Sequence, residues 1–230
     1  MGSEILIEAK ALTRATDDPD HALLLHTTDF ALRQGDRIVI SGSSGSGKSV
    51  FLRTLALLEA PSSGTVLWQG KPIASGQIPH YRSRISYVSQ RPALLDGTVE
   101  DNLRFPFTLK TSQQRTFDPD VVRALLERAG KGPGFLAKTA GDLSGGESQV
   151  VSLIRTLQLD PDVLLLDEPT AALDPTSAQA VEKLILAWFE GGSGKHHAYI
   201  WVSHDLEQTQ RMGTAHWQMD AGVLTEAAMR

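Results

Sequence analysis

The chain has 230 residues, which is enough for one large domain or for one domain with an inserted lobe. Apolar residues make up 41% of it, charged residues make up 21%, and it contains no cysteine, so disorder, disulfide scaffolds, thiolate chemistry and Cys-ligated metal sites are excluded. The net charge of −5 gives no global attraction to nucleic acid or anionic lipid. We expect neither a signal peptide nor a spanning helix, because residues 1–10 carry Glu4 and Glu8 and no long uncharged apolar run follows.

The first ninety residues are expected to form strands on either side of a glycine-rich loop. Short apolar or alternating segments predict antiparallel strands and a hairpin. These segments are 5–7, 22–25, 29–32, 63–68, 71–73 and 84–89. The β-branched run within 37–41 is typical of a strand buried on both faces. It leads directly into the loop, and a helix is predicted over 50–60, ended by Pro61.

Residues 90–142 carry helix signals and no strand pattern. Thr98 with Asp101 predicts a capping box, and Asp118–Pro119 predicts the start of a helix with one apolar face. From residue 143 onward, helix and strand patterns alternate, which is typical of a parallel sheet with crossover helices. The predicted helices are 145–159, 176–190 and 205–212, and the predicted strands are 163–166 and 198–202. We therefore predict one domain over 1–230, with its core in 1–89 and 143–230 and an inserted helical lobe at 90–142.

The segment Gly42–Ser49 fits the pattern G-x-x-x-x-G-K-S between a predicted strand and a predicted helix. Its glycines let successive backbone N–H groups point inward, and the helix N-terminus adds the positive end of its dipole. Lys48 is expected to neutralise the β- and γ-phosphates and Ser49 to bind Mg²⁺, whereas a flexible linker would leave the flanking elements unexplained. The expected ATP-binding residues here are Gly42, Ser43, Ser44, Gly45, Ser46, Gly47, Lys48, Ser49 and Val50.

Asp167 and Glu168 follow the four apolar residues of the predicted strand 163–166, at the carboxyl edge where ligands bind in parallel sheets. Asp167 is expected to hold Mg²⁺ directly or through water. Glu168 is expected to accept a proton from the water that attacks the γ-phosphate. Adjacent residues at a strand end point in different directions, so two distinct roles are compatible. A solvated strand end is the structural alternative.

The segment Leu143–Glu147 precedes a predicted helix and contains Ser144, Gly145 and Gly146. Ser144 and Glu147 fit a capping box, which is the purely structural interpretation. A capping box does not need the two glycines, each of which costs a helix about 1 kcal/mol relative to Ala. Bare N–H groups beside a serine hydroxyl suit a second phosphate-binding surface.

With these motifs in this order, the sequence resembles the ATP-binding-cassette (ABC) ATPases over residues 5–222. Their signature motif is the Leu-Ser-Gly-Gly sequence between the phosphate loop and the Asp-Glu strand. The resemblance implies an α/β P-loop NTPase with a RecA-like parallel core, an N-terminal antiparallel β lobe and an inserted α-helical lobe. It also implies ATP and Mg²⁺ as cofactors and a homodimer that forms on ATP binding. A separate integral membrane permease at the cytoplasmic face of the plasma (inner) membrane is the implied partner, and nucleic acid is not.

The resemblance gives roles to residues outside the two nucleotide motifs. Ser144, Gly145 and Gly146 are expected to bind the ATP held by the partner subunit, with Asp174 across the dimer seam. Two further roles belong to single residues.

Gln90 matches the glutamine that touches Mg²⁺ and the attacking water and senses the membrane partner. His204 matches the switch histidine that contacts the γ-phosphate. As isolated residues, a surface glutamine and a solvated histidine would be the ordinary interpretations. The family stacks adenine on an aromatic residue soon after its first strand; this chain has none there, although Arg14 offers a guanidinium plane.

Three stretches resemble more closely the ATPase subunits of Fet-type iron exporters and related plant aluminium-tolerance ATPases. They are residues 96–107, residues 152–158 and the short tail after His204. We therefore predict the ATPase subunit of an ABC transporter, with a metal (iron) exporter as the nearest likeness. The ATPase of an importer or another exporter stays open, as does a soluble ABC protein of DNA repair or translation. A P-loop kinase would leave 144–146 and His204 without a role.

Overall fold

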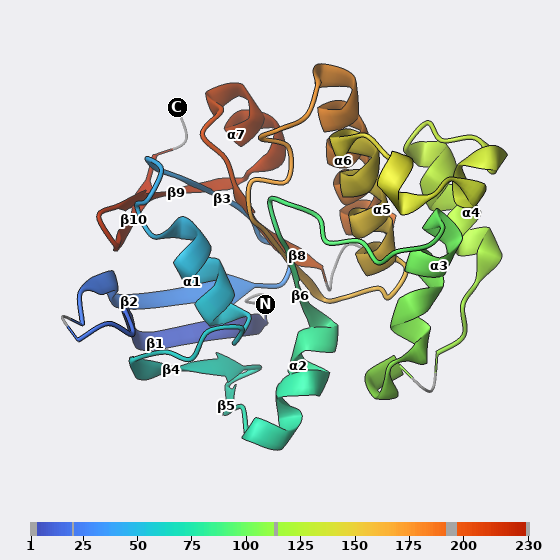
Figure 1. Ribbon diagram of the computed structural model, residues 1–230. Coiled ribbons are helices and arrows are strands. Elements are labelled where there is room, and N and C mark those ends of the chain that lie inside the picture. The colour runs from blue at the N-terminus through green and yellow to red at the C-terminus, as the bar shows by residue number, and fades with distance from the viewer. Residues whose placement is uncertain (1–3, 20, 113–114, 192–196, 229–230) are drawn as a thin grey trace. The chain divides into compact units, whose positions relative to one another are not determined.

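The computed structural model describes residues 4–19, 21–112, 115–191 and 197–228 (Figure 1). The chain divides into two compact units. We call them the sheet unit, which comprises residues 1–87, 162–168 and 193–230, and the helical unit, which comprises residues 88–161 and 169–192. The lobe predicted at 90–142 lies within the helical unit, which also takes in later residues.

In the described part of the chain, a six-stranded sheet forms the centre of the sheet unit. Its strands in spatial order are β10 (Val223–Ala227), β9 (Ala215–Asp220), β3 (Arg37–Ser41), β8 (Ala198–Val202), β7 (Val163–Leu166) and β6 (Ile85–Val88). β3 pairs in parallel with β8 and β9, β7 pairs in parallel with β8, and β9 and β10 are antiparallel. Every residue of β7 and β8 is buried, as expected for parallel strands of apolar residues. The predicted strands 37–41, 163–166 and 198–202 are confirmed.

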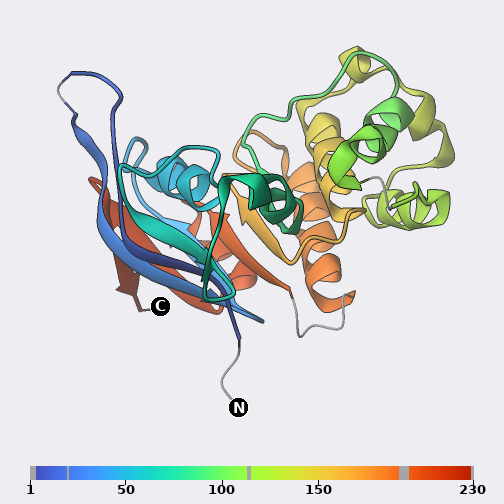
Figure 2. The ribbon, with the colours of Figure 1, turned by 90° about the horizontal axis from the view of Figure 1, so that it is seen from below.

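An antiparallel sheet with the strand order β2-β1-β4-β5 forms the N-terminal lobe of the sheet unit (Figure 2). Its strands are β1 (Ile5–Ala15), β2 (Leu23–Arg33), β4 (Ser63–Trp68) and β5 (Lys71–Pro72). The predicted antiparallel start and the hairpin after β4 are confirmed. The bounds predicted for the first strands are wrong, because 5–7 is the start of a longer strand, and 23–25 and 29–32 belong to one strand that begins after Ala22. β1 pairs with β2 on one side and with β4 on the other, with register shifts in both pairings.

Two helices of the sheet unit correspond to the predicted helices 50–60 and 205–212. α1 (Lys48–Leu55) starts directly after the glycine loop and ends earlier than the predicted residue 60, because Leu57 adopts a left-handed φ of 54°. α7 (Leu206–Met212) has Asp205 as its N-cap, which accepts hydrogen bonds from two backbone N–H groups of the first turn. A further helix, α2 (Ile78–Arg84), is not predicted by the sequence.

The two sheets and α1 share one hydrophobic core within the sheet unit. Phe30 of β2 meets the rings of Phe51 of α1 and Trp217 of β9 edge to face, each at 5.3 Å between centroids. Since Phe51 is fully buried, this contact fixes α1 against both sheets. The glycine loop between β3 and α1 is therefore held at both of its ends by core elements.

The helical unit contains α3 (Val99–Arg104), α4 (Pro119–Arg128), α5 (Gly145–Leu157) and α6 (Pro175–Gly191), with short 3-10 turns between them. The predicted capping box is confirmed, since Thr98 Oγ1 accepts from the Asp101 N–H at 3.1 Å and Asp101 Oδ2 accepts from the Thr98 N–H at 2.8 Å. The predicted N-cap Asp118 and the buried face of α4 are also confirmed. Among the described residues, no helix is long and apolar enough to cross a bilayer.

Candidate active site

The loop from Gly42 to Gly47 approaches neighbouring backbone so closely that two of its glycines have no room for a side chain. A Cβ at Gly42 would overlap the carbonyl oxygen of Met219. Gly47 has a φ of +106°, and a Cβ there would lie 2.7 Å from the carbonyl oxygen of Leu24. The N–H of Gly222 also donates to the carbonyl oxygen of Ser46 at 2.8 Å. These contacts hold the loop in the curled form that an anion-binding nest requires.

The ammonium of Lys48 is buried at the mouth of this loop. Its side chain is 5% exposed, and Nζ donates hydrogen bonds of 2.8 Å to the carbonyl oxygens of Gly42 and Ser43. Nζ also lies 3.9 Å from Oε1 of Glu168. A positive charge is thus held beside the inward-facing loop, where the sequence predicts the β- and γ-phosphates.

Asp167 is buried and accepts two hydroxyl hydrogen bonds. Ser49 Oγ donates to Oδ1 at 2.9 Å, and the hydroxyl of Tyr87 donates to Oδ2 at 2.7 Å. The predicted metal residues Ser49 and Asp167 are therefore in contact. Burial raises the pKa of the Tyr87 hydroxyl, as does its hydrogen bond to Asp167. Tyr87 is not predicted from the sequence, because its only local signal is a polar group within a strand that enters the site.

Glu168 has a left-handed backbone, with a φ of +47°, which costs a non-glycine residue about 1–2 kcal/mol. Its carboxylate lies 3.9 Å from Lys48 Nζ and 4.0 Å from Nδ1 of His204. Asp167 and Glu168 thus face different partners, as their adjacency predicts. Strain at a carboxylate between an ammonium and an imidazole is typical of a functional site.

The turn that carries His204 is fixed on both sides, although the imidazole itself is largely exposed. Before it, Ser203 Oγ donates to the side-chain oxygen of Gln208 at 2.8 Å. After it, Asp205 caps α7, and its backbone N–H donates to Ser203 Oγ at 3.0 Å. His204 is therefore held on a rigid turn at the carboxyl end of β8 while its ring can turn toward a ligand.

In the helical unit, Ser144 is the N-cap of α5. Its Oγ accepts from the Glu147 N–H at 3.2 Å, and its own N–H donates to Glu147 Oε2 at 3.1 Å. The structure therefore contains the predicted capping box, which confirms the structural role of Ser144. Its role in phosphate binding remains a prediction. Lys138 and Lys131 place their ammonium groups 2.9 Å and 3.6 Å from Glu147 Oε1. The hydrogen bond from Lys138 lowers the pKa of Glu147, although partial burial opposes this.

Replacement of Glu147 by glutamine is expected to lower the free energy of unfolding at pH 7 by about 0.5–1 kcal/mol, because both lysine contacts lose their charge partner. The folded-state pKa of Glu147 lies below its unfolded value, so its contribution is present above about pH 4.3 and is lost as the pH falls through the folded-state pKa. Urea unfolding from neutral to acidic pH should show the two proteins converging. The exposed Glu127→Gln in the same unit is the control; an equal loss there would contradict the prediction.

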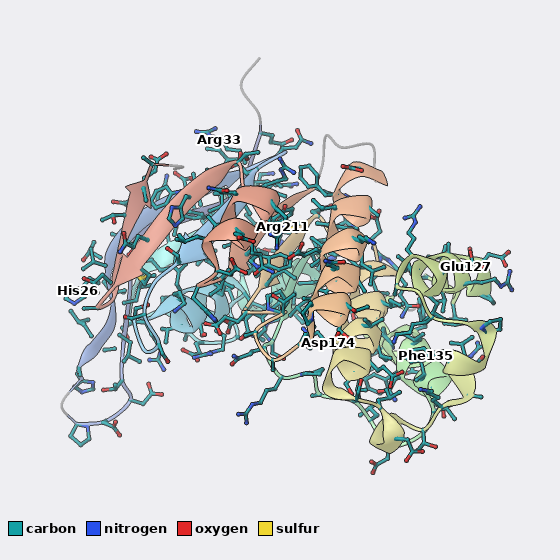
Figure 3. All side chains as sticks on the ribbon, turned by 90° about the horizontal axis from the view of Figure 1, so that it is seen from above. His26, Arg33, Glu127, Phe135, Asp174 and Arg211 are labelled. Carbon is teal, nitrogen blue, oxygen red and sulfur yellow. The ribbon has the colours of Figure 1, made fainter. Side chains whose placement is uncertain are left out.

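Gly146 and Asp174 lie side by side in the helical unit. A Cβ at Gly146 would overlap the side chain of Ser177, whose Oγ donates to Asp174 Oδ2 at 2.6 Å. Asp174 Oδ1 also accepts from the N–H groups of Thr176 and Ser177, each at 3.0 Å, at the start of α6 (Figure 3). The hydrogen bond from the Ser177 hydroxyl lowers the pKa of Asp174. Gly146, which is buried, and the exposed Asp174 therefore lie close together in this unit.

The sheet unit brings together Gly42–Ser49, Asp167, Glu168 and His204, whereas the helical unit holds Gln90, Ser144–Gly146 and Asp174. Gln90 is exposed and follows β6 after one intervening residue. The roles predicted for all these residues stay predictions.

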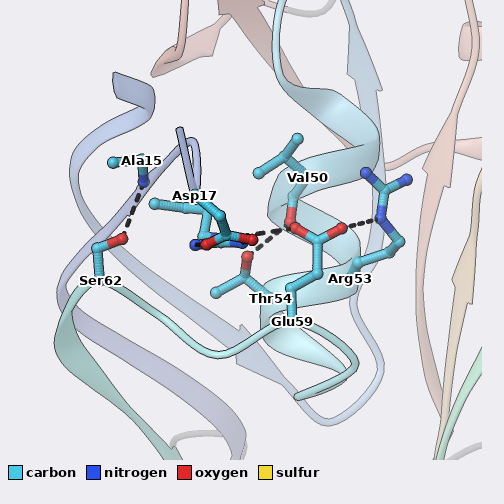
Figure 4. A network of polar contacts seen from close by, with 8 residues as sticks. Ala15, Asp17, Val50, Arg53, Thr54, Glu59 and Ser62 are labelled. Atoms are coloured by element: carbon cyan, nitrogen blue, oxygen red, sulfur yellow. Dashed lines mark hydrogen bonds and ion pairs between the residues drawn. The ribbon is translucent and has the colours of Figure 1, made fainter. Parts of the chain in front are cut away.

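Arg14 is already engaged by carboxylates. Its two terminal nitrogens donate to Asp17 at 2.9 Å each, and Nε lies 3.6 Å from Glu59 Oε2 (Figure 4). The hydrogen bond to Asp17 raises the pKa of Arg14 in spite of burial. Its guanidinium plane is thus fixed at the end of β1, where the family's aromatic residue is absent.

Comparison with known proteins gives one consistent result. The sequence profile described as "ABC transporter" matches residues 25–171. The probable iron export ATP-binding protein FetA of Escherichia coli is 40% identical over 81% of this chain and 80% of its own length. ABC transporter I family member 17 of Arabidopsis thaliana is 38% identical over 92% of this chain and 77% of its own length. Among solved structures, cbiO1 of Clostridium perfringens, part of the ABC transporter complex cbiONQ, has a TM-score of 0.78 at 25% identity, covering 96% of this chain and 87% of that one.

Proposed function

Because the chain belongs to the ABC transporter family, as one of its ATP-hydrolysing subunits, we propose that two copies of it enclose ATP head to tail and drive a separate membrane permease. The observation that carries the proposal is the convergence of Lys48, Glu168 and His204, with 3.9 Å and 4.0 Å separating the Glu168 carboxylate from the other two groups. An ammonium, a carboxylate and an imidazole beside a glycine-rich loop supply the charges that γ-phosphate hydrolysis needs.

In this mechanism the loop N–H groups and Lys48 bind the β- and γ-phosphates. Glu168 takes a proton from water as the water oxygen bonds to the γ-phosphorus, and the bond from that phosphorus to the β–γ bridging oxygen breaks to leave ADP and phosphate. The imidazole of His204 hydrogen-bonds the γ-phosphate.

The donor set fits Mg²⁺, which takes oxygen ligands and is usually held by one or two protein groups together with phosphates. Ser49 Oγ and the Asp167 carboxylate are in contact and would hold it. When bound, the ion neutralises phosphate charge. No group of three or more His, Asp or Glu side chains among the described residues forms a metal site by itself, which agrees with an ion that arrives with ATP.

The second half of each proposed ATP site comes from the other copy of the chain. Ser144 and the N–H groups of Gly145 and Gly146 at the start of α5 would bind the γ-phosphate of the partner's ATP, with Asp174 at the seam. Closure would exclude all water except the attacking molecule. The similarity to FetA supports metal (iron) export as the transport reaction, with the chain at the cytoplasmic face of the membrane through its permease and without a nucleic-acid partner.

The test is complementation between two inactive variants, Lys48→Ala and Ser144→Arg. A mixed dimer would contain one site with both lesions and one site with none. An equimolar mixture should therefore recover up to about a quarter of the wild-type ATPase rate, since half of the dimers are mixed and each has one intact site. The matched control mixes Lys48→Ala with Glu168→Gln, which lie in the same half-site and should not recover. Absence of recovery in the first mixture, at concentrations where wild-type chains pair, would contradict the shared site.

A further inference from the structure

Asp167 is oriented by two hydroxyl groups that come from different elements. Ser49 at the start of α1 holds Oδ1, and Tyr87 of β6 holds Oδ2 at 2.7 Å. Asp167 is only 4% exposed, so water is a minor partner and these two donors set the plane of the carboxylate. The Tyr87 hydroxyl is thus the group that decides which oxygen remains turned toward Ser49.

Tyr87 is itself held by a chain of charged groups within the sheet unit. Its hydroxyl contacts the guanidinium of Arg53, and Arg53 Nε donates to Glu59 Oε1 at 2.5 Å. Burial alone would lower the pKa of Arg53, but the hydrogen bonds to Glu59 and Tyr87 outweigh it and raise this pKa, so Arg53 stays charged. The other carboxylate oxygen of Glu59, Oε2, lies 3.6 Å from Nε of Arg14 (Figure 4). The hydroxyl therefore has a defined direction between Arg53 and Asp167.

We infer that Tyr87 is a positioning residue for the metal step: its hydroxyl fixes Oδ2 of Asp167 so that Oδ1 and Ser49 present a preformed pair of oxygen ligands. The inference rests on the proposed function, in which Asp167 and Ser49 hold the divalent ion. Groups that hydrogen-bond a metal ligand orient it, and their removal typically costs about 10- to 100-fold in metal affinity. A tyrosine that only fills the core would have no such effect when its hydroxyl alone is removed.

The test compares Tyr87→Phe with Tyr81→Phe. Both changes keep the ring and remove one hydroxyl, and the hydroxyl of Tyr81 donates to the backbone carbonyl oxygen of Leu55 at 2.6 Å, which is not a predicted ligand. Mn²⁺ is titrated into the full chain in the presence of ADP and followed by electron paramagnetic resonance. Tyr87→Phe should raise the Mn²⁺ dissociation constant about 10-fold, whereas Tyr81→Phe should leave it unchanged. ADP affinity in excess EDTA should match the wild type in both variants.

Asp167→Asn separates the failure of this inference from the failure of the proposed function. If Asp167→Asn weakens Mn²⁺ binding and Tyr87→Phe does not, Tyr87 has only a structural role and the inference is overturned while the metal assignment stands. If Asp167→Asn leaves Mn²⁺ binding unchanged, the metal assignment itself is wrong. Weaker binding in both variants, with Tyr81→Phe unaffected, supports the inference. Weaker binding in Tyr81→Phe equal to that in Tyr87→Phe would overturn it.

Discussion

Replacement of Glu168 by glutamine is expected to lower kcat for ATP hydrolysis about 10²- to 10⁴-fold, because an amide cannot accept the proton of the attacking water. Lys48 and the loop N–H groups remain in place, so ATP binding should be retained. Loss of one negative charge 3.9 Å from Lys48 Nζ also removes repulsion against the γ-phosphate. Single-turnover hydrolysis and equilibrium ATP binding measure the two effects, and size-exclusion chromatography with ATP should show a trapped dimer.

The control for this variant is Glu226→Gln. Glu226 is exposed on β10 within the same unit, and the chemical change is identical. It should hydrolyse ATP at the wild-type rate. Undiminished turnover of Glu168→Gln would refute Glu168 as the base, and a loss of ATP binding would mean that the carboxylate acts mainly in holding the loop and Lys48.

The sequence predicts best the elements that consist of a short run of apolar residues, because such a run indicates a buried strand. β7 and β8 coincide with their predicted bounds because every residue in them is buried and the neighbouring residues are polar or small. β9 and β10 are not predicted from the sequence, because they are partly exposed and mix polar with apolar residues. Their one local signal is the turn at Ala221 and Gly222, where both residues have positive φ and join the strands as a two-residue hairpin.

In the candidate site, the residues that can be predicted from the sequence are those that lie close to one another along the chain. The loop from Gly42 to Ser49 and the Asp167–Glu168 pair are recognisable because the motif and its flanking elements are contiguous. Tyr87 is not recognisable, because its partner Asp167 is 80 positions away and only strand order brings them together. The left-handed backbone of Glu168 is also invisible in sequence, since glutamate rarely adopts that conformation.

The conformation of the phosphate loop gives the second large prediction, Gly47→Ala. We expect ATP affinity to fall by more than about 100-fold, because the loss of two charge-assisted hydrogen bonds costs about 3–6 kcal/mol. The added Cβ would lie 2.7 Å from the carbonyl oxygen of Leu24, and Gly47 has a φ of +106°, so the loop must move. Isothermal titration calorimetry measures the affinity, and urea unfolding should show a loss of about 1–3 kcal/mol.

Gly45→Ala is the matched control for Gly47→Ala. It lies in the same loop with a φ of +78°, but a Cβ there meets no atom within 4 Å. Its cost is therefore backbone strain alone, about 1–2 kcal/mol in stability, and its ATP affinity should fall less than that of Gly47→Ala. Equal losses of ATP affinity in the two variants would show that left-handed strain, and not the close approach of the Leu24 backbone, limits the loop. A larger loss in Gly47→Ala ties phosphate binding to the contact between this loop and β2.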